Sequence, residues 1–289
     1  MKYILGDNPF FGVNHKNGSK GLESQEARFN NAGNVILEAV NAGIDNLMIS
    51  THPDYENLLG RTNKIIGELH HGLSLALVIP YPHTINKILA ERGILGLLGI
   101  IPWFRVHKIT AGIINYIFFK DRQILAREAF KSIIEIELRK LRGLDKIHVT
   151  HIALHNIFTD ICIANNWCDI LDGFVAAVQA SKLKPVLISQ NPVQVMELPY
   201  DQKVIRCFSY NLNGYMQNAP QSELIKSLQK SKRADIPCWG MQILAAGSIP
   251  SEKALSDPNL EYFEGILYAT SRSERIREFS AVAEKYFGK

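Results

Sequence analysis

Two side chains able to do acid–base chemistry follow apolar runs that are typical of buried parallel strands. Tyr55 comes shortly after the run 46–49, and His155 directly follows the run 152–154. In a β/α barrel, catalytic groups sit at the carboxyl ends of the strands. A phenol at such an end can donate a proton to a substrate oxygen, and an imidazole can polarise that oxygen. The pattern therefore predicts acid–base chemistry at one end of a barrel.

Three histidines offer a different chemistry at the same end. His52 follows the second predicted strand, His83 follows the third and His155 ends the fourth. Three imidazoles from neighbouring strands could bind a divalent metal ion, as in a metal-dependent lyase or hydrolase. Asp7 and Gln190 could add oxygen ligands. The histidines are far apart in sequence and form no H-x-H pair, so the metal site stands as an alternative.

The elements that would position these residues alternate between strand and helix along almost the whole chain. Such alternation is typical of parallel βα units, and it predicts a closed (β/α)8 TIM barrel formed by a single domain, residues 1–289. The eight strands are expected over Tyr3–Leu5, Asn46–Ile49, Leu75–Ile79, Thr150–Leu154, Pro185–Ile188, Val204–Ser209, Pro237–Met241 and Gly265–Tyr268. Helices are expected over Asn34–Ala42, Asn57–Leu69, Gln123–Leu141, Ile170–Ala180, Glu223–Lys232 and Ser273–Phe287, with Ser273 as the N-cap of the last.

The third unit is longer than the others. Residues 83–120 form an insertion rich in Ile, Leu, Phe and Gly. Pro102, Arg105 and Lys108 interrupt its most apolar part, so we expect no transmembrane segment. The insertion is expected to form helices that pack on the barrel or make a homo-oligomer contact. The alternatives are a lid over the site and a contact with a membrane surface.

Composition narrows the classes of function. The chain has 46% apolar residues among 289, enough for one large core. Its net charge is only +4, with Lys and Arg spread along the sequence, which argues against a nucleic-acid partner and leaves a small molecule as the expected one. Neither a Rossmann nor a P-loop glycine motif occurs. The four cysteines show no C-x-x-C spacing, and no secretory leader is visible, so we expect reduced thiols and a cytoplasmic location.

An ordered set of short motifs resembles the aldo-keto reductase superfamily. The matching segments are Ile4-Leu5-Gly6 with Phe10-Phe11-Gly12, Gly43-Ile44 with Tyr55 and Leu58-Leu59-Gly60-Arg61, Leu154-His155, Ile188-Ser189-Gln190-Asn191, Tyr210-Asn211, Trp239 to Gly247, and Ala269-Thr270-Ser271-Arg272 with Arg275-Ile276-Arg277-Glu278. The resemblance covers most of the chain outside the insertion.

This resemblance implies reduction of a carbonyl compound with NADPH, in which Tyr55 donates the proton and His155 orients the carbonyl. The family also uses an aspartate and a lysine that tune the tyrosine. Here Ser50 stands five residues before Tyr55, where it is expected to form a hydrogen bond, and the third strand ends without a lysine. Without a nearby cation the tyrosine pKa returns toward about 10, which slows alcohol oxidation by roughly three decades and reduction by less.

The resemblance also implies where NADP would bind. Ser189 and Asn191 would hold the carboxamide, and further candidates are Tyr210, Met241, Thr270, Ser271, Arg272 and Arg275, the last four near a helix start that favours anions. Cys207 replaces a glutamine that usually reaches the carboxamide, and Phe279 replaces an asparagine used for adenine. Because the aspartate and lysine that tune the tyrosine are missing, a barrel that binds a ligand without redox chemistry is a third alternative.

Overall fold

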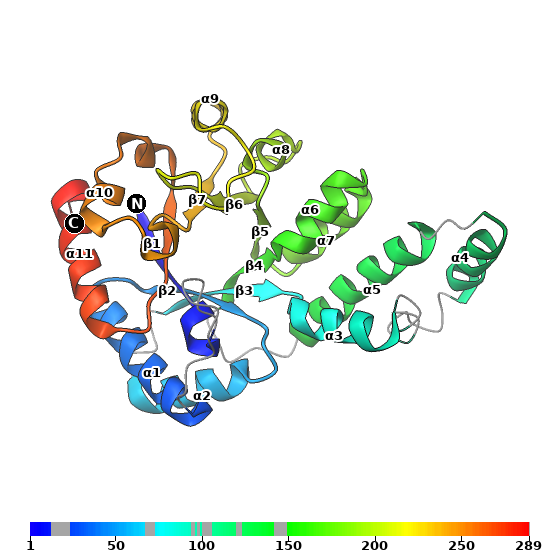
Figure 1. Ribbon diagram of the computed structural model, residues 1–289, viewed down its shortest axis with the longest axis horizontal. Helices are drawn as coiled ribbons and strands as arrows, with labels where there is room; N and C mark the ends of the chain where they lie inside the picture. Colours follow the sequence, from blue (N-terminus) through cyan, green and yellow to red (C-terminus); the bar gives the residue numbers. More distant parts are fainter. Residues whose placement is uncertain are drawn as a thin grey trace.

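Eight parallel strands close into a barrel in sequence order, so the predicted TIM barrel is confirmed (Figure 1). The computed structural model describes residues 1–12, 24–66, 73–93, 96, 99, 106–119, 123–141 and 149–288. Each strand pairs with the next, and β8 pairs with β1. The strands are β1 (Lys2–Gly6), β2 (Asn46–Ser50), β3 (Ser74–Ile79), β4 (Val149–Leu154), β5 (Lys184–Ser189), β6 (Ile205–Ser209), β7 (Cys238–Met241) and β8 (Gly265–Tyr268).

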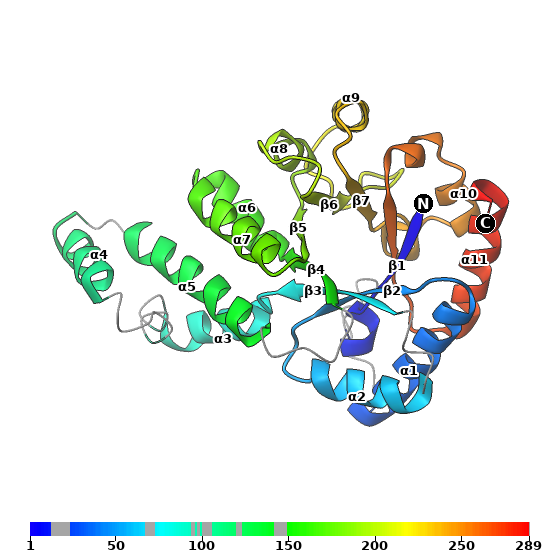
Figure 2. The same ribbon diagram turned by 180° about the vertical axis from the view of Figure 1, so that it is seen from behind.

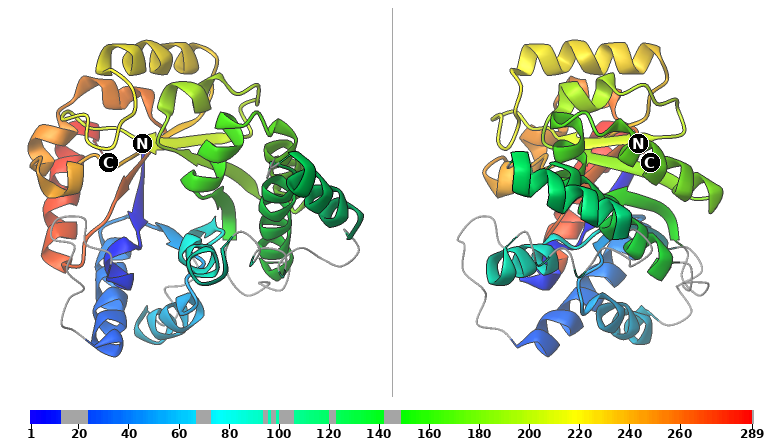
Figure 3. Two further views of the ribbon diagram at one scale, coloured as in Figure 1. Left: turned by 45° about the vertical axis from the view of Figure 1, so that its right-hand side comes forward. Right: turned by 90° about the vertical axis from the view of Figure 1, so that its right-hand side faces the viewer.

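Helices surround the barrel (Figure 3). They are α1 (Gln25–Asn41), α2 (Tyr55–Ile66), α3 (Pro82–Arg92), α4 (Val106–Phe119), α5 (Gln123–Leu141), α6 (Asn156–Ala164), α7 (Cys168–Ala180), α8 (Pro192–Glu197), α9 (Gln221–Arg233), α10 (Ser251–Leu255) and α11 (Ser273–Phe287). Short 3-10 turns are η1 (Asn8–Phe11), η5 (Ala245–Gly247) and η6 (Pro258–Tyr262).

Some predicted helix boundaries were wrong. The first helix begins at Gln25 rather than at residue 34, because the Ser24 side chain accepts a hydrogen bond from the Ala27 backbone N–H and caps it there. Helix α6 was not predicted at all. The N-cap of α11 is Arg272 rather than Ser273, and its side chain makes no capping hydrogen bond. The end of the second predicted helix, residues 67–69, lies outside the described residues.

Alternation along each strand divides the core in two. One set of side chains fills the barrel interior, and the other packs against the helices. The interior set is Ile4, Met48, Ala76, Val78, Ala153, Val186, Ile188, Ile205, Cys207 and Trp239. A residue at the carboxyl end of a strand therefore lies at the barrel mouth when it continues the interior alternation.

Three helices between β3 and β4 extend away from the barrel as an arm (Figures 1 and 2). We call α3, α4 and α5 the arm; it contains the described part of the predicted insertion. Near the start of α5, at the end that follows α4, Arg127 forms an ion pair with Asp169 of α7 at 2.6 Å. At the far end of the arm, α4 packs on α5 and exposes large apolar side chains. No helix in the described ranges is long and apolar enough to cross a membrane.

All four cysteines are free thiols. Cys162, Cys207 and Cys238 are buried, whereas Cys168, the first residue of α7, is exposed. Burial raises the pKa of Cys162 and of Cys238 to about 12 in each case. These two thiols therefore stay protonated and unreactive at neutral pH.

Candidate functional site

A buried carboxylate, Asp7, lies at the carboxyl end of β1. Its side chain is 5% exposed, and its Oδ2 accepts a hydrogen bond from the Ser50 backbone N–H at 2.6 Å. Burial raises the pKa of Asp7 to about 6, although hydrogen bonds from Ser50 act in the opposite direction. Near neutral pH this group can therefore take up and release a proton. Ser50 was expected to form a hydrogen bond near the site, and its backbone N–H forms one with Asp7.

Three aromatic rings, those of Phe11, His52 and Tyr81, lie close together after the ends of β1, β2 and β3. The rings of Phe11 and His52 stack with centroids 4.3 Å apart, and the Tyr81 ring meets His52 edge-on at 4.8 Å. Burial raises the pKa of Tyr81, and the charges of Asp7 and Asp54 raise it further. The phenol of Tyr81 and the Asp7 carboxylate thus lie within electrostatic reach of each other.

We call Asp7, Phe11, His52 and Tyr81 the mouth cluster. Its members follow three adjacent strands, β1, β2 and β3, at the end where barrel enzymes carry their catalytic groups. Tyr81 was not predicted as a site residue, and Asp7 was predicted only as a metal ligand. Their positions in the sequence could have indicated both, because each lies within two residues of the end of a strand.

Tyr55, the predicted proton donor, is the first residue of α2. Its hydroxyl donates to Glu56 Oε1 at 3.3 Å. Burial raises the pKa of Tyr55 to about 12, and the charges of Glu56 and of Glu137 on α5 raise it as well. Tyr55 is thus close to two carboxylates instead of a cation, and it stays protonated. Its role as a proton donor remains a prediction.

His155 lies at the carboxyl end of β4, where it is also the N-cap of α6. Its Nδ1 accepts a hydrogen bond from the Ile157 backbone N–H at 3.3 Å, and its own backbone N–H donates to Ile79 O at 2.8 Å. The Nδ1 atom therefore lacks a proton, and the neutral ring carries its proton on Nε2. A neutral His155 can donate from Nε2, which is compatible with the predicted polarising role.

Two of the three histidines of the alternative metal site, His52 and His155, are among the side chains that the structure describes. His52 accepts a hydrogen bond from the Asp54 backbone N–H through Nδ1 at 3.0 Å. The His83 side chain lies outside the described residues, so the predicted trio with His155 stays a prediction. Among the residues that the structure does describe, no group of three or more His, Cys, Asp or Glu side chains could hold a metal ion.

The predicted carboxamide site is already occupied by contacts within the protein. The fully buried Ser189 donates through Oγ to Asp160 Oδ1 at 2.5 Å and accepts from the Asn191 backbone N–H at 2.8 Å. Asp160 Oδ2 accepts from the Gln190 backbone N–H at 3.1 Å. Burial raises the pKa of Asp160, and these hydrogen bonds oppose that rise. The hydroxyl of Ser189 is therefore used to fix the turn after β5.

Gln190 is the first residue after β5. It comes two residues after Ile188, which faces the barrel interior. Its backbone is held on both sides, because the N–H donates to Asp160 and the carbonyl accepts from the Asn218 N–H at 3.3 Å. A primary amide can donate to and accept from another carboxamide.

Tyr210 does not face the mouth. Its side chain is 1% exposed, its hydroxyl donates to Asp257 Oδ2 at 2.6 Å, and its ring contacts Phe263 with centroids 5.0 Å apart. Burial, together with the hydrogen bond to Asp257, raises the pKa of Tyr210. Cys207 is fully buried in the barrel interior, whereas Met241 is half-buried at the edge of that interior.

The predicted anion site lies at the start of α11. Thr270 Oγ1 accepts from the Arg272 backbone N–H at 3.2 Å, and Ser271 O accepts from the Asn31 side chain at 2.8 Å. Arg272 is exposed, and Arg275 forms an ion pair with Glu278 at 2.7 Å. The first N–H groups of this 15-residue helix and the Arg272 side chain can therefore meet a phosphate.

Phe279 is part of the core. It is fully buried, and its ring stacks on Tyr268 with centroids 4.2 Å apart and an angle of 7° between the planes. It cannot contact adenine in this position. The NADP site therefore remains a prediction, and two of its predicted residues, Ser189 and Tyr210, use their hydroxyls in hydrogen bonds within the protein.

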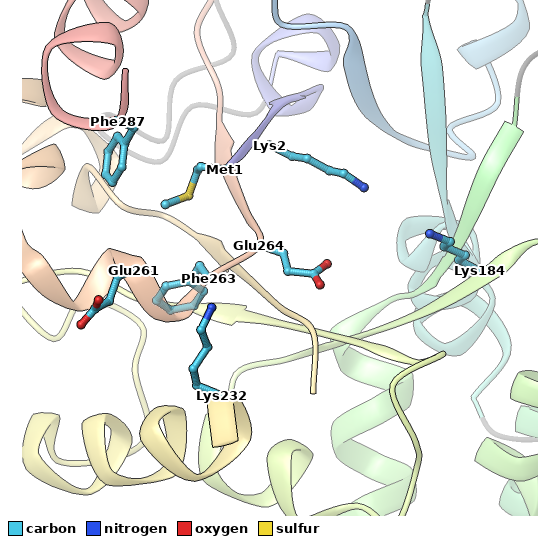
Figure 4. A pocket seen from close by; sticks show the side chains of 8 residues that line it. All are labelled: Met1, Lys2, Lys184, Lys232, Glu261, Phe263, Glu264 and Phe287. Carbon is cyan, nitrogen blue, oxygen red and sulfur yellow. The ribbon is translucent and has the colours of Figure 1, made fainter. Parts of the chain in front are cut away.

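A separate cavity of about 580 Å³ lies at the opposite, amino end of the strands (Figure 4). Figure 4 shows the side chains of Lys2, Lys184 and Glu264 around this cavity. In barrels this end generally serves stability, not catalysis. We therefore place the candidate site at the mouth cluster. The cavity is lined by Met1, Lys2, Lys184, Lys232, Glu261, Phe263, Glu264 and Phe287.

Comparisons with known proteins support the fold. The chain matches no protein-family model, and no curated protein matches its sequence. Its structure is similar to that of a protein from Pseudomonas aeruginosa assigned to the aldo-keto reductases, with a TM-score of 0.57 and 12% identity over 98% of this chain and 90% of the other. A protein assigned as a 2,5-diketo-D-gluconic acid reductase B gives a TM-score of 0.53 and 14% identity, over 98% and 82%. The chain therefore shares the TIM-barrel fold of these two proteins.

Proposed function

We propose that this protein is an oxidoreductase that reduces a carbonyl compound with NADPH at the carboxyl end of the barrel. The observation that carries the proposal is the mouth cluster, which brings a phenol, a carboxyl group of pKa about 6 and an imidazole to three adjacent strand ends. The structural similarity to a protein assigned to the aldo-keto reductases supports the same reaction class.

We assign the role of proton donor to Tyr81, whose ring contacts His52 in the mouth cluster. Reduction adds a hydride to the carbonyl carbon and a proton to the oxygen, and bound NADPH would supply the hydride. The Tyr81 hydroxyl gives its proton to the developing alkoxide, and Asp7, which is partly protonated near neutral pH and acts electrostatically on Tyr81, is the candidate group to restore that proton. His155 polarises the carbonyl from the end of β4. Because the Tyr81 pKa is raised, the site suits reduction better than alcohol oxidation.

The cofactor would be held mainly at its phosphates. Thr270, Ser271 and Arg272 at the start of α11 provide the anion site, with Arg275 available if it leaves its ion pair with Glu278. Gln190 takes the place of Ser189 and Asn191 as partner of the carboxamide. Met241 would contact the nicotinamide ring from the edge of the barrel interior.

Two single variants test the assignment of the acid. Wild type, Tyr81→Phe and Tyr55→Phe would each be titrated with NADPH, following nicotinamide fluorescence and calorimetry, and then assayed on a panel of aldehydes and ketones. We expect micromolar NADPH binding by all three and a loss of about 10²- to 10⁴-fold in kcat/KM for Tyr81→Phe alone. A loss of kcat/KM in Tyr55→Phe but not in Tyr81→Phe would show that Tyr55 is the proton donor. Absence of binding at millimolar NADPH would refute the redox function.

A barrel that binds a phosphorylated small molecule without turnover is the second candidate. It is favoured by one observation: the hydroxyls of Ser189 and Tyr210 are both held by carboxylates inside the protein, so neither is free for a nicotinamide. The same calorimetry with inorganic phosphate and a sugar phosphate distinguishes the two. Binding of the sugar phosphate but not of NADPH, lost in Arg272→Gln, would establish this second function.

A further inference from the structure

The outward face of α4 carries large apolar side chains that none of the described residues covers. Ile114 is 50% exposed, Ile117 56%, Phe118 74% and Phe119 75%. Ile114, Ile117 and Phe118 follow the i, i+3, i+4 spacing of one helix face, and Phe119 adjoins them. Soluble surfaces seldom carry such a contiguous group without a partner.

The opposite face of α4 is already satisfied by α5. Gly112 is buried against Leu125, and a Cβ at residue 112 would lie only 2.5 Å from that side chain. This close approach fixes which side of α4 faces α5 and which side faces outward. Helix α4 lies at the far end of the arm, away from the barrel strands, as Figures 1 and 2 show.

The net charge of the sequence around α4 favours an anionic partner for its apolar face. Residues 93–122 contain four Lys or Arg residues and one acidic residue, Asp121, which gives 4 − 1 = +3. Within α4 itself there is no acidic residue, and Lys108 is exposed at its start. The same stretch contains five Phe, Tyr or Trp residues. A helix with an apolar aromatic face and basic flanks is typical of segments that lie in a membrane interface.

A second copy of the chain fits this face less well. In a symmetric dimer through α4 the Lys108 side chains of both copies would add positive charge, and no acidic residue of α4 would compensate. Anionic lipid headgroups instead complement the charge while the acyl region covers the apolar side chains. We infer that α4 docks the protein on the surface of a membrane that contains anionic lipids, with Phe118 and Phe119 inserted at the headgroup boundary.

Vesicle binding tests the inference on the full chain. The protein would be sedimented with phosphatidylcholine vesicles that contain about 30% phosphatidylserine, an anionic lipid, and separately with pure phosphatidylcholine vesicles. We expect binding to the anionic vesicles that weakens at high salt, and at least tenfold weaker binding by the double variant Phe118→Ser, Phe119→Ser. Lys108→Gln should weaken it about fivefold, the effect of one cation near the surface.

A matched control separates this face from exposed apolar side chains in general. Leu212 and Met216, on the loop after β6, are 40% and 37% exposed, and Leu212→Ser with Met216→Ser should leave vesicle binding unchanged. Circular dichroism and the denaturation midpoint confirm that both double variants fold. Equal vesicle binding by wild type and the Phe118, Phe119 variant, or no binding at all, would overturn the inference. Light scattering that shows a dimer abolished by this variant would assign the face to a second copy.

Discussion

Replacing Asp7 by Asn should make the protein more stable at neutral pH. In the unfolded chain this carboxyl ionises near its ordinary pKa of 3.8, whereas in the folded chain burial moves the pKa to about 6. Between these values the folded protein holds a proton that the unfolded chain has lost. The wild-type protein therefore loses stability as the pH rises through this window, and the full cost is present above pH 6.

The size of the stability difference follows from the change in the pKa of Asp7 on folding. About two pKa units at 1.36 kcal/mol each correspond to about 3 kcal/mol, of which about 2 kcal/mol develops between pH 4.5 and 7.5. The Asn side chain does not ionise, and its carbonyl oxygen can still accept the hydrogen bond from the Ser50 backbone N–H. The gain in free energy of unfolding of Asp7→Asn over wild type should accordingly grow by about 2 kcal/mol across this range.

Urea denaturation of both proteins at several pH values measures this gain. Taking the difference between variant and wild type cancels every group that both proteins share. Glu284→Gln, at an exposed position on α11, controls for the general effect of removing one negative charge. A gain that stays constant between pH 4.5 and 7.5 would show that Asp7 is not desolvated as described. If Asp7 also passes protons to Tyr81, the more stable variant should be the slower enzyme.

Three other buried polar groups give further predictions. Tyr210→Phe should lower the free energy of unfolding by about 1–3 kcal/mol, because Asp257 loses a buried donor; a urea midpoint equal to that of wild type would contradict this. Arg206→Met should cost about 3–5 kcal/mol in the same assay, since the fully buried guanidinium donates to four backbone carbonyls between residues 198 and 204. Asp160→Ala should speed amide hydrogen exchange in the turn after Ser189, and unchanged exchange there would exclude its anchoring role.

The barrel could be predicted because its signals are local. Each strand is a short apolar run, and the helical segments between them show periodic patterns. The missed helix α6 starts directly after β4 with His155 as its N-cap, a residue type that does not usually mark a helix start. The early start of α1 depends on Ser24, which precedes a polar stretch without clear periodicity.

The site was less predictable because its contacts are nonlocal. Asp7 meets Ser50 across 43 residues of sequence, through the pairing of β1 with β2. The hydroxyl of Tyr210 reaches Asp257 across 47 residues, and that of Ser189 reaches Asp160 across 29. A sequence shows that a residue follows a strand, but not whether its polar atom already has a partner inside the fold.

The distribution of thiols makes the arm accessible to spectroscopy. Cys168 is the one exposed cysteine of the four, and its neighbour Asp169 forms an ion pair with Arg127 near the start of α5. A maleimide dye should therefore label the unmodified protein at a single position, while the buried thiols stay unlabelled. Its emission would report movement between α5 and α7 without any engineered cysteine, during titration with NADPH or with vesicles.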